Sequence, residues 1–534
     1  MATTTEKQPL SLADCLESSA ERFPSRAAVV DPSGKETSYQ ELNACSGRVA
    51  AFLAAHGVGS GDRVAVLLPK SSVAITAIFG ILKARAAYVP IDWTAPADRV
   101  RTILGDCKTK ALFTTASLAA VLDGADELPT TLVVAGASDG TVTSTVRGVT
   151  TWEEVQAQKL PPVSSNGRSR DDLAYILYTS GSTGVPKGVM LSHGNALSFV
   201  DWCSSVFEPT EEDRFSSHAP FHFDLSVLDL YVSLKHGASV HLIDDATGKN
   251  PKQLTNFVAE RRLTVWYSTP SILHLMTSFG NLQQVDCSSL RLVLFAGEVF
   301  PIKHLRELTK MLPHPRYCNL YGPTETNVCT YAWVPSVTPE DRREPYPIGR
   351  PCSHCSAKVL DEHGGEVAQG EEGILYIAGE SVFQGYWNRP RENGAAFRER
   401  NGVRWYCTGD LVREKPEDGY VYRGRRDRMV KRRGYRIELD DIERALYRHD
   451  GIRKAAVIAV ETAGADLKII AFLEAQGEPR PGIIEMKMFC GRYLPAYMSP
   501  DVFTFADSLP RTSTDKTDYQ ALVRRFCEGA SLGT

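Results

Sequence analysis

Small hydroxyl side chains alternate with glycines in the segment from residue 177 to residue 188, and a lysine follows them. Glycine lets backbone N–H groups approach an anion closely, and small hydroxyls add hydrogen-bond donors without bulk. Because the lysine adds a mobile positive charge, we expect this loop to bind a polyphosphate. The alternative is a flexible linker, but an apolar, strand-like run at 174–178 precedes the loop, and loops at strand ends often carry ligands. The loop residues concerned are Thr179, Ser180, Gly181, Thr183, Gly184, Lys187 and Gly188.

Five further segments carry side chains that suit the same chemistry. Residues 319–326 join an aromatic ring, a tight turn, a hydroxyl and a carboxylate, and residues 406–411 place a carboxylate after a glycine. That second carboxylate is a suitable acceptor for paired ribose hydroxyls. Residues 424–427 and 431–436 supply positive charge, and residues 509–516 end in a lysine close to the C-terminus. Each segment alone is a weak signal, but all six in this order predict one nucleotide site.

Short apolar strands alternate with helices between these motifs. Residues 39–56 place apolar side chains on one face at helical spacing, with Ser38 as a suitable N-cap and Gly57 as a stop signal. The alternation continues to about residue 400 and predicts an α/β fold with largely buried sheets. The next expected elements are a strand at 63–68, a helix at 73–84 and a strand at 87–91.

Eight basic residues surround one acid, Asp427, between residues 423 and 436. Taken alone, this charge run also fits a solvated surface loop or a nucleic-acid patch. About a hundred residues follow it, which suffices for a small α+β domain. Strands are expected there at 455–460 and 468–473 and a helix at 483–493. We therefore predict two domains, 1–426 and 427–534, which meet at Asp427.

A chain of 534 residues exceeds one ordinary hydrophobic core, so two or more domains are expected. Its net charge of −4 argues against a general nucleic-acid binder. No apolar run reaches the roughly 18 residues of a membrane span, and the N-terminus lacks the apolar core of a signal peptide. We therefore expect a cytoplasmic protein with no nucleic-acid or membrane partner. The twelve cysteines are scattered, and the close pair Cys352 and Cys355 has no second pair at zinc spacing, which favours reduced thiols.

Together the six segments resemble the adenylate-forming superfamily of acyl-CoA synthetases, luciferases and nonribosomal-peptide adenylation domains. The resemblance covers residues 10 to 525, nearly the whole chain. It implies a large N-terminal domain of two α/β subdomains plus a β-barrel, followed by a small mobile α+β C-terminal domain. It also implies an activity: Mg²⁺ and ATP are used to convert a carboxylate into an acyl-adenylate, and the acyl group then passes to a thiol.

The resemblance also assigns roles to individual residues. The loop at 179–187 should hold the β- and γ-phosphates, Thr324 should contact the α-phosphate, and Glu325 should hold Mg²⁺. Lys516 should bridge the attacking carboxylate and the α-phosphate. Because in-line attack brings anions together, positive charge acts here by electrostatic stabilisation and positioning. The implied catalytic residues are Lys187, Thr324, Glu325 and Lys516. The ATP site is completed by Asn319 and Tyr321 around the adenine, Asp410 on the ribose, and Gly322, Tyr422 and Arg425.

Each of these assignments has a structural alternative. Tyr321 can be a packed aromatic, Asp410 a turn cap, and Lys516 a solvated lysine of the tail. Residues 514–515 are Thr-Asp, where peptide-synthetase relatives often have Asn-Gly, which leaves the local turn before Lys516 open.

Asp224 is the residue that discriminates between carboxylate substrates. It follows Phe223 in an otherwise apolar segment, where a lone carboxylate is costly to bury, and a substrate ammonium would compensate it. This matches the aspartate by which amino-acid-activating members bind the α-amino group. The alternative is a helix N-cap. Aligned on the motifs, the substrate pocket is formed by Asp224, Leu225, Leu228, Tyr267, Leu294, Ala296, Leu320, Val328, Cys329 and Lys516.

This pocket is apolar between two polar ends, so we expect a compact apolar amino acid. The ten positions resemble those of the stand-alone L-proline-activating enzymes of pyrrole-forming secondary metabolism, which implies L-proline as substrate. A secondary ammonium has two N–H donors, and one carboxylate can accept both. The alternatives are another small apolar amino acid, an acyl- or aryl-CoA ligase, and a catalytically silent nucleotide-binding protein.

About eighteen residues follow Lys516, too few for a carrier domain. We therefore expect the thiol to belong to a separate partner, which the resemblance identifies as a holo peptidyl carrier protein acting in trans. The family's thioester step implies that the small domain swings about the hinge Asp427. This motion would remove Lys516 and bring residues 431–434 to the path of the thiol.

Overall fold

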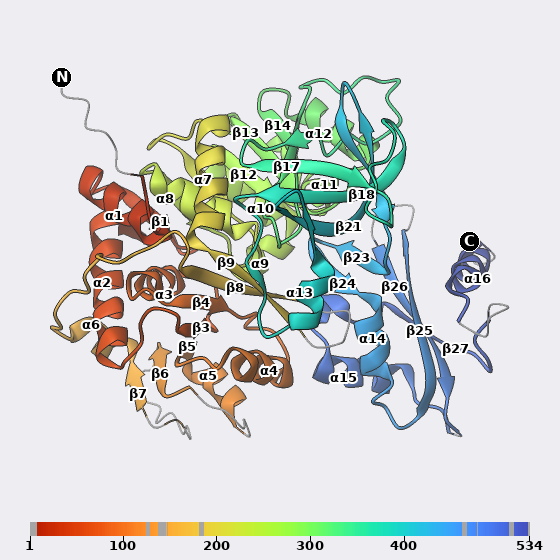
Figure 1. The fold of residues 1–534 in the computed structure, drawn as a ribbon, viewed down its shortest axis with the longest axis horizontal. Coiled ribbons are helices and arrows are strands. Elements are labelled where there is room, and N and C mark those ends of the chain that lie inside the picture. Colours follow the sequence, from red (N-terminus) through yellow and green to blue (C-terminus); the bar gives the residue numbers. More distant parts are fainter. Residues whose placement is uncertain are drawn as a thin grey trace. The chain divides into compact units, whose positions relative to one another are not determined.

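A computed structural model describes residues 8–123, 129–136, 146, 148–180, 186–461, 467–477, 479–511 and 517–531 of the chain. The chain divides into two compact units (Figure 1). The larger unit consists of residues 1–93, 104–178 and 188–426, and the smaller unit consists of residues 94–103, 179–187 and 427–534. Helices alternate with mixed sheets in the larger unit, so the predicted α/β fold is confirmed.

An eight-stranded sheet in the order β19-β9-β8-β4-β3-β5-β6-β7 carries the first half of the larger unit. Helix α2 (Tyr39–Ala55) begins after Ser38, which exchanges capping hydrogen bonds with Glu41. The apolar helix α3 (Ser72–Lys83) packs against it, and both elements lie within two residues of their predicted bounds. The strands are β3 (Arg63–Val66), β4 (Ala87–Pro90), β5 (Ala111–Thr115), β6 (Thr131–Ala135), β7 (Gly148–Thr151), β8 (Leu173–Thr179), β9 (Lys187–Ser192) and β19 (Gly385–Tyr386). The other helices in this part of the chain are α1 (Leu12–Arg22), α4 (Ala97–Cys107), α5 (Ala116–Ala119) and α6 (Trp152–Ala157).

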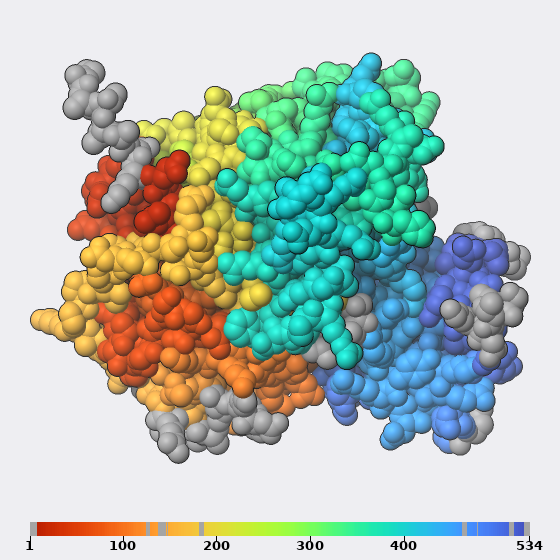
Figure 2. Space-filling model, viewed as in Figure 1, coloured from red at the N-terminus to blue at the C-terminus, as the bar shows by residue number. Residues whose placement is uncertain are grey.

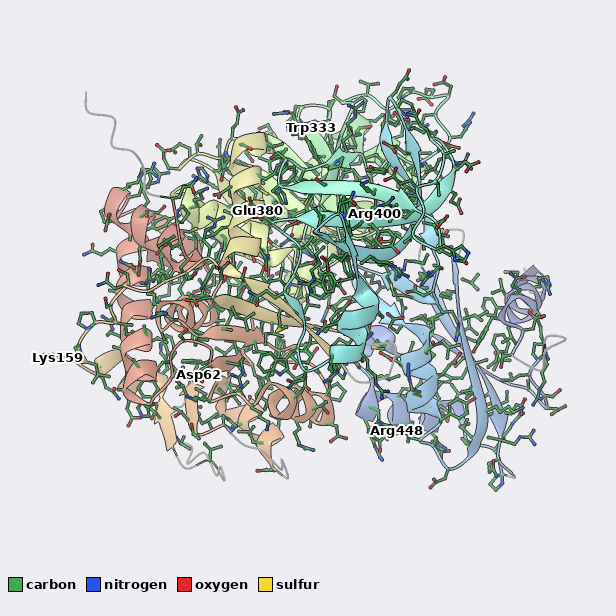
Figure 3. The ribbon with its side chains drawn as sticks, in the orientation of Figure 1. Asp62, Lys159, Trp333, Glu380, Arg400 and Arg448 are labelled. Carbon is green, nitrogen blue, oxygen red and sulfur yellow. The ribbon has the colours of Figure 1, made fainter. Side chains whose placement is uncertain are left out.

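A nine-stranded sheet in the order β16-β15-β14-β13-β12-β10-β11-β1-β2 carries the second half of the larger unit. At one end of it, the Arg316 guanidinium carbon lies 3.9 Å from the ring centroid of Trp333, which is labelled in Figure 3. The strands are β1 (Ala27–Val30), β2 (Glu36–Ser38), β10 (Arg214–Ser217), β11 (Ser239–Leu242), β12 (Val265–Ser268), β13 (Leu292–Ala296), β14 (Arg316–Tyr321), β15 (Thr330–Val334) and β16 (Arg350–Pro351). The helices are α7 (His193–Phe207), the π-helix η2 (Leu228–Val232), α8 (Ser233–Lys235), α9 (Asp245–Lys249), α10 (Pro251–Glu260), α11 (Pro270–Phe279) and α12 (Ile302–Met311).

An antiparallel sheet of five strands completes the larger unit, in the region where the family resemblance implies a β-barrel. The long strand β21 (Val403–Lys415) pairs with three of the others. Those strands are β18 (Glu372–Gly379), β20 (Phe397–Arg400) and β22 (Gly419–Arg425), and β17 (Cys355–Leu360) pairs with β18. Helix α13 (Pro390–Ala396) precedes β20.

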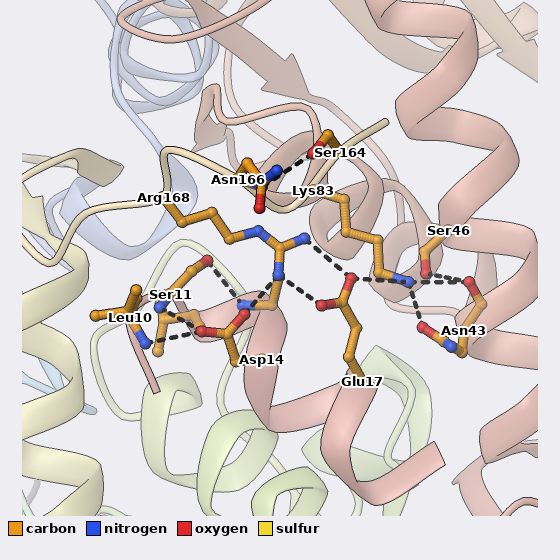
Figure 4. Close-up of polar contacts among 12 residues, drawn as sticks. Leu10, Ser11, Asp14, Glu17, Asn43, Ser46, Lys83, Ser164, Asn166 and Arg168 are labelled. Atoms are coloured by element: carbon orange, nitrogen blue, oxygen red, sulfur yellow. Dashed lines mark hydrogen bonds and ion pairs between the residues drawn. The ribbon is translucent and has the colours of Figure 1, made fainter. Parts of the chain in front are cut away.

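The segment that leads into β8 is fastened to helix α1 by Arg168, and Glu17 of α1 is linked in turn to Lys83 of α3 at 3.9 Å (Figure 4). The Arg168 guanidinium donates to Asp14 and Glu17 of α1, and the Lys83 ammonium of α3 donates to the carbonyl and side-chain oxygens of Asn43 on α2. Figure 2 shows this gold-coloured part of the chain on the surface, across the red N-terminal helices. The network therefore fixes the start of the strand that ends at the predicted phosphate loop.

The smaller unit contains a hairpin, a three-stranded sheet and helices. Strands β23 (Met429–Arg432) and β24 (Tyr435–Glu438) are joined by Arg433 and Gly434, with φ of 52° and 82°, as a tight hairpin turn requires. Strands β25 (Ile452–Glu461) and β26 (Leu467–Ala475) contain the two predicted strands, and α15 (Ile483–Tyr493) has the predicted bounds. The remaining elements are α14 (Leu439–Leu446), β27 (Val502–Phe505) and α16 (Tyr519–Ser531).

Candidate functional site

Asp410 is a buried carboxylate that joins two other predicted nucleotide-binding residues in the larger unit. It lies on β21 with 1% of its surface exposed. The Tyr321 hydroxyl donates to Oδ2, and Arg425, which lies opposite on β22, donates to Oδ1 at 3.0 Å. Burial and the Asp410 charge raise the pKa of Tyr321 well above its usual range, so its hydroxyl keeps its proton. The carboxylate is held in place, and each oxygen retains a second lone pair for a ligand hydroxyl.

Glu325 is the second buried acid of this region, with 0% exposure. Tyr386 of β19 donates its hydroxyl to Oε1 at 2.7 Å, and the Phe383 N–H donates to the Glu325 carbonyl at 2.8 Å. The turn before Glu325 is tight, because a Cβ on Gly322 would lie 1.5 Å from the carbonyl oxygen of Asn327. Sequence reasoning missed Tyr386, since its two-residue strand carries no local sign that it reaches a carboxylate 61 positions earlier.

Glu325 supplies a carboxylate donor of the kind that hard divalent cations take. Among the described residues, no group of three or more His, Cys, Asp and Glu side chains could hold a metal by itself. Mg²⁺ is commonly bound by one or two carboxylates together with substrate phosphates and water. A single oriented carboxylate such as Glu325 fits that pattern. Cys352 and Cys355 are both free thiols, as expected.

The other predicted adenine-site residues lie on strands next to this pair of acids. Asn319 of β14 donates its side-chain amide to the carbonyl of Pro347 at 2.8 Å. Tyr422 of β22 packs against the apolar cluster that contains Tyr321, and Thr324 is partly buried in the turn after β14.

The predicted phosphate loop belongs to the smaller unit. Thr179 ends β8, Lys187 begins β9 and is buried, and Ser180 donates its hydroxyl to the carbonyl of Arg436 at 2.8 Å. There is no room for a side chain at Gly188, because a Cβ there would lie 2.7 Å from the side chain of Ile176. The predicted residues Gly181, Thr183, Gly184 and Lys516 lie outside the described residues.

Asp224 lies in the turn between β10 and the π-helix η2 and is partly buried. Its carbonyl accepts the N–H of Val227 at 3.0 Å, and the preceding Phe223 N–H bonds to Pro220, so the backbone turns tightly here. Burial raises the pKa values of Tyr175 and Tyr267, and the negative charge of Asp224 raises both further. The charge of Asp224 therefore acts on two tyrosine side chains, one from each of the two large sheets.

The predicted pocket walls share one face of the nine-stranded sheet. Tyr267 pairs with Leu294 across β12 and β13, and Ala296 pairs with Leu320 across β13 and β14. Because side chains alternate along a strand, these residues face one core while neighbours such as Trp266 face another. Leu225, Leu228 and Val328 belong to the same core as the pocket walls, and the buried Cys329 belongs to the adjoining cluster around Tyr321.

Three arginines of the basic segment at 423–436 pair with acids of the smaller unit. Arg428 bonds to Glu443 at 2.8 Å, Arg432 to Asp501 at 2.6 Å, and Arg436 to Glu438 at 3.3 Å. Asp427 is exposed, and its side chain accepts the N–H of Met429 at 3.3 Å. These ion pairs give Arg428, Arg432 and Arg436 a structural role within the smaller unit.

In the described part of the chain, no helix is long and apolar enough to cross a membrane.

Comparison with known proteins gives consistent matches over almost the whole chain. The AMP-binding enzyme family matches residues 16–387, and the AMP-binding enzyme C-terminal domain matches residues 441–516. An L-proline–[L-prolyl-carrier protein] ligase of Streptomyces coelicolor is 43% identical over 91% of this chain and 91% of its own length. A ligase of the same name from Pseudomonas fluorescens is 40% identical over 94% of this chain and 97% of its own.

A solved structure shares the fold. The adenylation domain AlmE of Vibrio cholerae, in complex with glycyl-adenosine-5'-phosphate, superposes with a TM-score of 0.83 at 23% identity. The match covers 99% of this chain and 100% of that domain.

Proposed function

Because this chain belongs to the AMP-binding enzyme family, we propose that it adenylates L-proline with ATP and transfers the prolyl group to the thiol of a separate carrier protein. The observation that carries the proposal is the identity of 40–43%, over more than nine-tenths of each chain, to two ligases named for this reaction. The apolar face beside Asp224 supports the same substrate.

In the first step, a carboxylate oxygen of proline attacks the α-phosphorus of ATP. The bond from that phosphorus to the bridging oxygen breaks, and pyrophosphate leaves. We propose that Lys187 and the loop at 179–187 hold the phosphates, and that Thr324 and Lys516 stabilise the charge at the α-phosphorus. Asn319, Tyr321, Gly322 and Tyr422 would hold the adenine side of the nucleotide, and Asp410, fixed by Arg425, would accept the ribose hydroxyls.

AMP-binding enzymes use ATP, and we propose that this one uses it with Mg²⁺. Glu325 would hold the ion, which would neutralise phosphate charge during the displacement. Tyr386 orients Glu325 for this role through its hydrogen bond to Oε1.

The substrate end of the site would select a small amino acid with a secondary amine. The two N–H donors of the prolinium ion can both bond to the Asp224 carboxylate. Leu225, Leu228, Leu294 and Leu320 would fill the space that a larger side chain needs, and Tyr267, Ala296, Val328 and Cys329 would complete the wall.

In the second step, the carrier thiol loses its proton to solvent, its sulfur attacks the prolyl carbonyl carbon, and AMP leaves. We propose that the domain 427–534 turns about Asp427 between the two steps, withdrawing Lys516 and presenting residues 431–434 to the thiol. The carrier arm would be the phosphopantetheine of a holo peptidyl carrier protein.

Amino-acid-dependent exchange of pyrophosphate into ATP, measured across the standard amino acids, tests the substrate. L-proline should give the highest kcat/KM, with slow use of close analogues, because one methylene changes binding by only about 1–3 kcal/mol. A better substrate of another class would overturn the assignment.

The acceptor is tested separately. Loading of a holo carrier protein should be much faster than thioester formation with free coenzyme A. Efficient prolyl transfer to coenzyme A, or activation of a fatty or aryl acid, would instead support an acyl- or aryl-CoA ligase.

A further inference from the structure

Lys70 lies between the two large sheets of the larger unit and was not among the predicted site residues. It belongs to the loop after β3 of the eight-stranded sheet. Its ammonium donates to the carbonyl oxygens of Ser217 at 2.7 Å and His218 at 2.8 Å. Those two residues end β10 of the nine-stranded sheet and begin the segment that carries Asp224. One cation therefore fixes the entry to that segment.

Asp229 lies at the other end of the same segment, in the π-helix η2. It is 0% exposed, and neither carboxylate oxygen accepts a hydrogen bond from a described residue. Burial raises the pKa of this carboxyl group well above its usual range, and the positive charge of Lys70 opposes that effect only in part. A π-turn is rare and is frequently found at functional sites, and this one begins at Leu228, four residues after Asp224.

We propose that Lys70 is a positioning residue for the substrate amine, because its ammonium holds the entry to the segment 217–229 by two hydrogen bonds to backbone carbonyls. The proposal rests on the proposed function, since it assigns Asp224 to the amine. A merely structural lysine would stabilise the fold without preferentially changing the affinity for the amino acid.

The surroundings of Lys70 make its charge sensitive to pH. Burial lowers its pKa to about 8, although the carboxylates of Asp229, Asp244 and Asp245 raise it. The neighbouring His218 has a pKa lowered to about 4 by burial and by Lys70, so it stays neutral at neutral pH. As the pH rises through about 8, the ammonium loses its charge, and its two hydrogen bonds to the carbonyls of Ser217 and His218 weaken. The KM for proline should therefore rise above this pH.

Steady-state pyrophosphate exchange at pH 7 tests the proposal with Lys70→Met. The KM for L-proline should rise about 10- to 100-fold, the range expected for losing hydrogen bonds from a charged donor, while the KM for ATP changes less than about twofold. Lys83→Met is the matched control, because Lys83 is also buried with a pKa lowered to about 8, but it bonds to Asn43 on α2. The control variant should keep the wild-type KM for proline.

Two conservative variants keep the test decisive if Lys70→Met does not fold. Lys70→Arg retains a charge whose pKa lies above about 12, so its KM for proline should stay flat where the wild-type KM rises. Asp245→Asn removes a charge that raises the pKa of Lys70, so the rise should move to lower pH.

A wild-type KM for proline that is flat to pH 9.5, or a Lys70→Met variant whose two KM values change equally, would overturn the positioning role. Wild-type protein without any amino-acid-dependent exchange would overturn the proposed function and this inference together. Normal exchange in the wild type with an unchanged KM in Lys70→Met would overturn this inference alone.

Discussion

The two ends of the candidate site hold their buried acids in opposite ways. At the nucleotide end, Asp410 accepts hydrogen bonds from Tyr321 and Arg425, and Glu325 accepts one from Tyr386. At the amino-acid end, Asp229 accepts none from a described residue, and burial raises its pKa well above the usual range. The acids of the nucleotide end are therefore fixed by directional contacts, while Asp229 at the amino-acid end lies in an apolar core without such contacts.

This difference agrees with what the two ends have to recognise. A nucleotide presents the same hydroxyls and phosphates to every member of the family, so rigid acceptors suit it. The amino-acid end must discriminate by size, and apolar walls discriminate weakly by themselves. Because Asp224 is a single acid beside apolar walls, a substrate needs an amine that bonds to this carboxylate.

The largest effect is expected at the amino-acid end. Asp224→Ala should lower kcat/KM for L-proline by on the order of 10²–10³-fold, because a charged pair shielded from water loses one partner. The affinity for ATP, measured by calorimetry without amino acid, should remain as in the wild type. Asp286→Ala removes an exposed acid as a control, and proline turnover close to wild type in the Asp224 variant would refute its role.

At the nucleotide end, replacing Asp410 by alanine should lower the stability of the fold as well as the affinity for ATP. Asp410→Ala leaves Arg425 and Tyr321 without their acceptor, and breaking a buried ion pair costs about 3–5 kcal/mol. Chemical denaturation should show this loss, and ATP should bind more weakly. Glu366→Ala is the control, since it removes a surface partner of Lys358 and of Arg400, which is labelled in Figure 3, and should change the unfolding midpoint far less.

A smaller effect is expected when Glu325 keeps its charge but loses the hydrogen bond that orients it. Tyr386→Phe removes one hydrogen bond to a carboxylate, worth about 1.5–3 kcal/mol. At limiting Mg²⁺ the exchange rate should fall about tenfold or more, and saturating Mg²⁺ should recover part of it. Tyr317→Phe removes another buried hydroxyl, which donates to the Leu312 carbonyl at 2.6 Å, and should not change the Mg²⁺ dependence. Equal Mg²⁺ titrations for all three proteins would contradict the orientation of Glu325 by Tyr386.

The smallest effect concerns acid stability at the amino-acid end. Burial and Lys70 lower the pKa of His218 to about 4, below the value of 6.5 expected in the unfolded chain. The unfolded chain therefore binds more protons between these values, and the stability contributed by neutral His218 is lost as the pH falls from 6.5 toward 4.

Urea titrations at several pH values test this contribution. His218→Gln should flatten the dependence of unfolding free energy on pH by at most about 1.4 kcal/mol per pH unit. The exposed His363→Gln should leave the slope unchanged. An unchanged slope in His218→Gln would mean that His218 is not held neutral.

The nucleotide end was the more predictable part of the molecule. Tyr321, Asp410 and Arg425 come from three separate motifs, and the structure bonds them to one another. The strand register accounts for part of this, since it places Arg425 opposite Asp410 on the adjacent strand. Tyr386 and Lys70 were not predicted, because each acts on a site residue that is remote in sequence.

The sequence by itself determined the helices, the strands and the order of the motifs, since capping boxes, apolar periodicity and glycine turns act over a few residues. Helix α2 after Ser38 and helix α15 from Ile483 to Tyr493 follow from such local signals. Only the tertiary structure decided which side chains share a buried carboxylate and which lysine fixes the segment around Asp224. Those contacts depend on how separate sheets pack, and long-range packing leaves no local pattern along the chain.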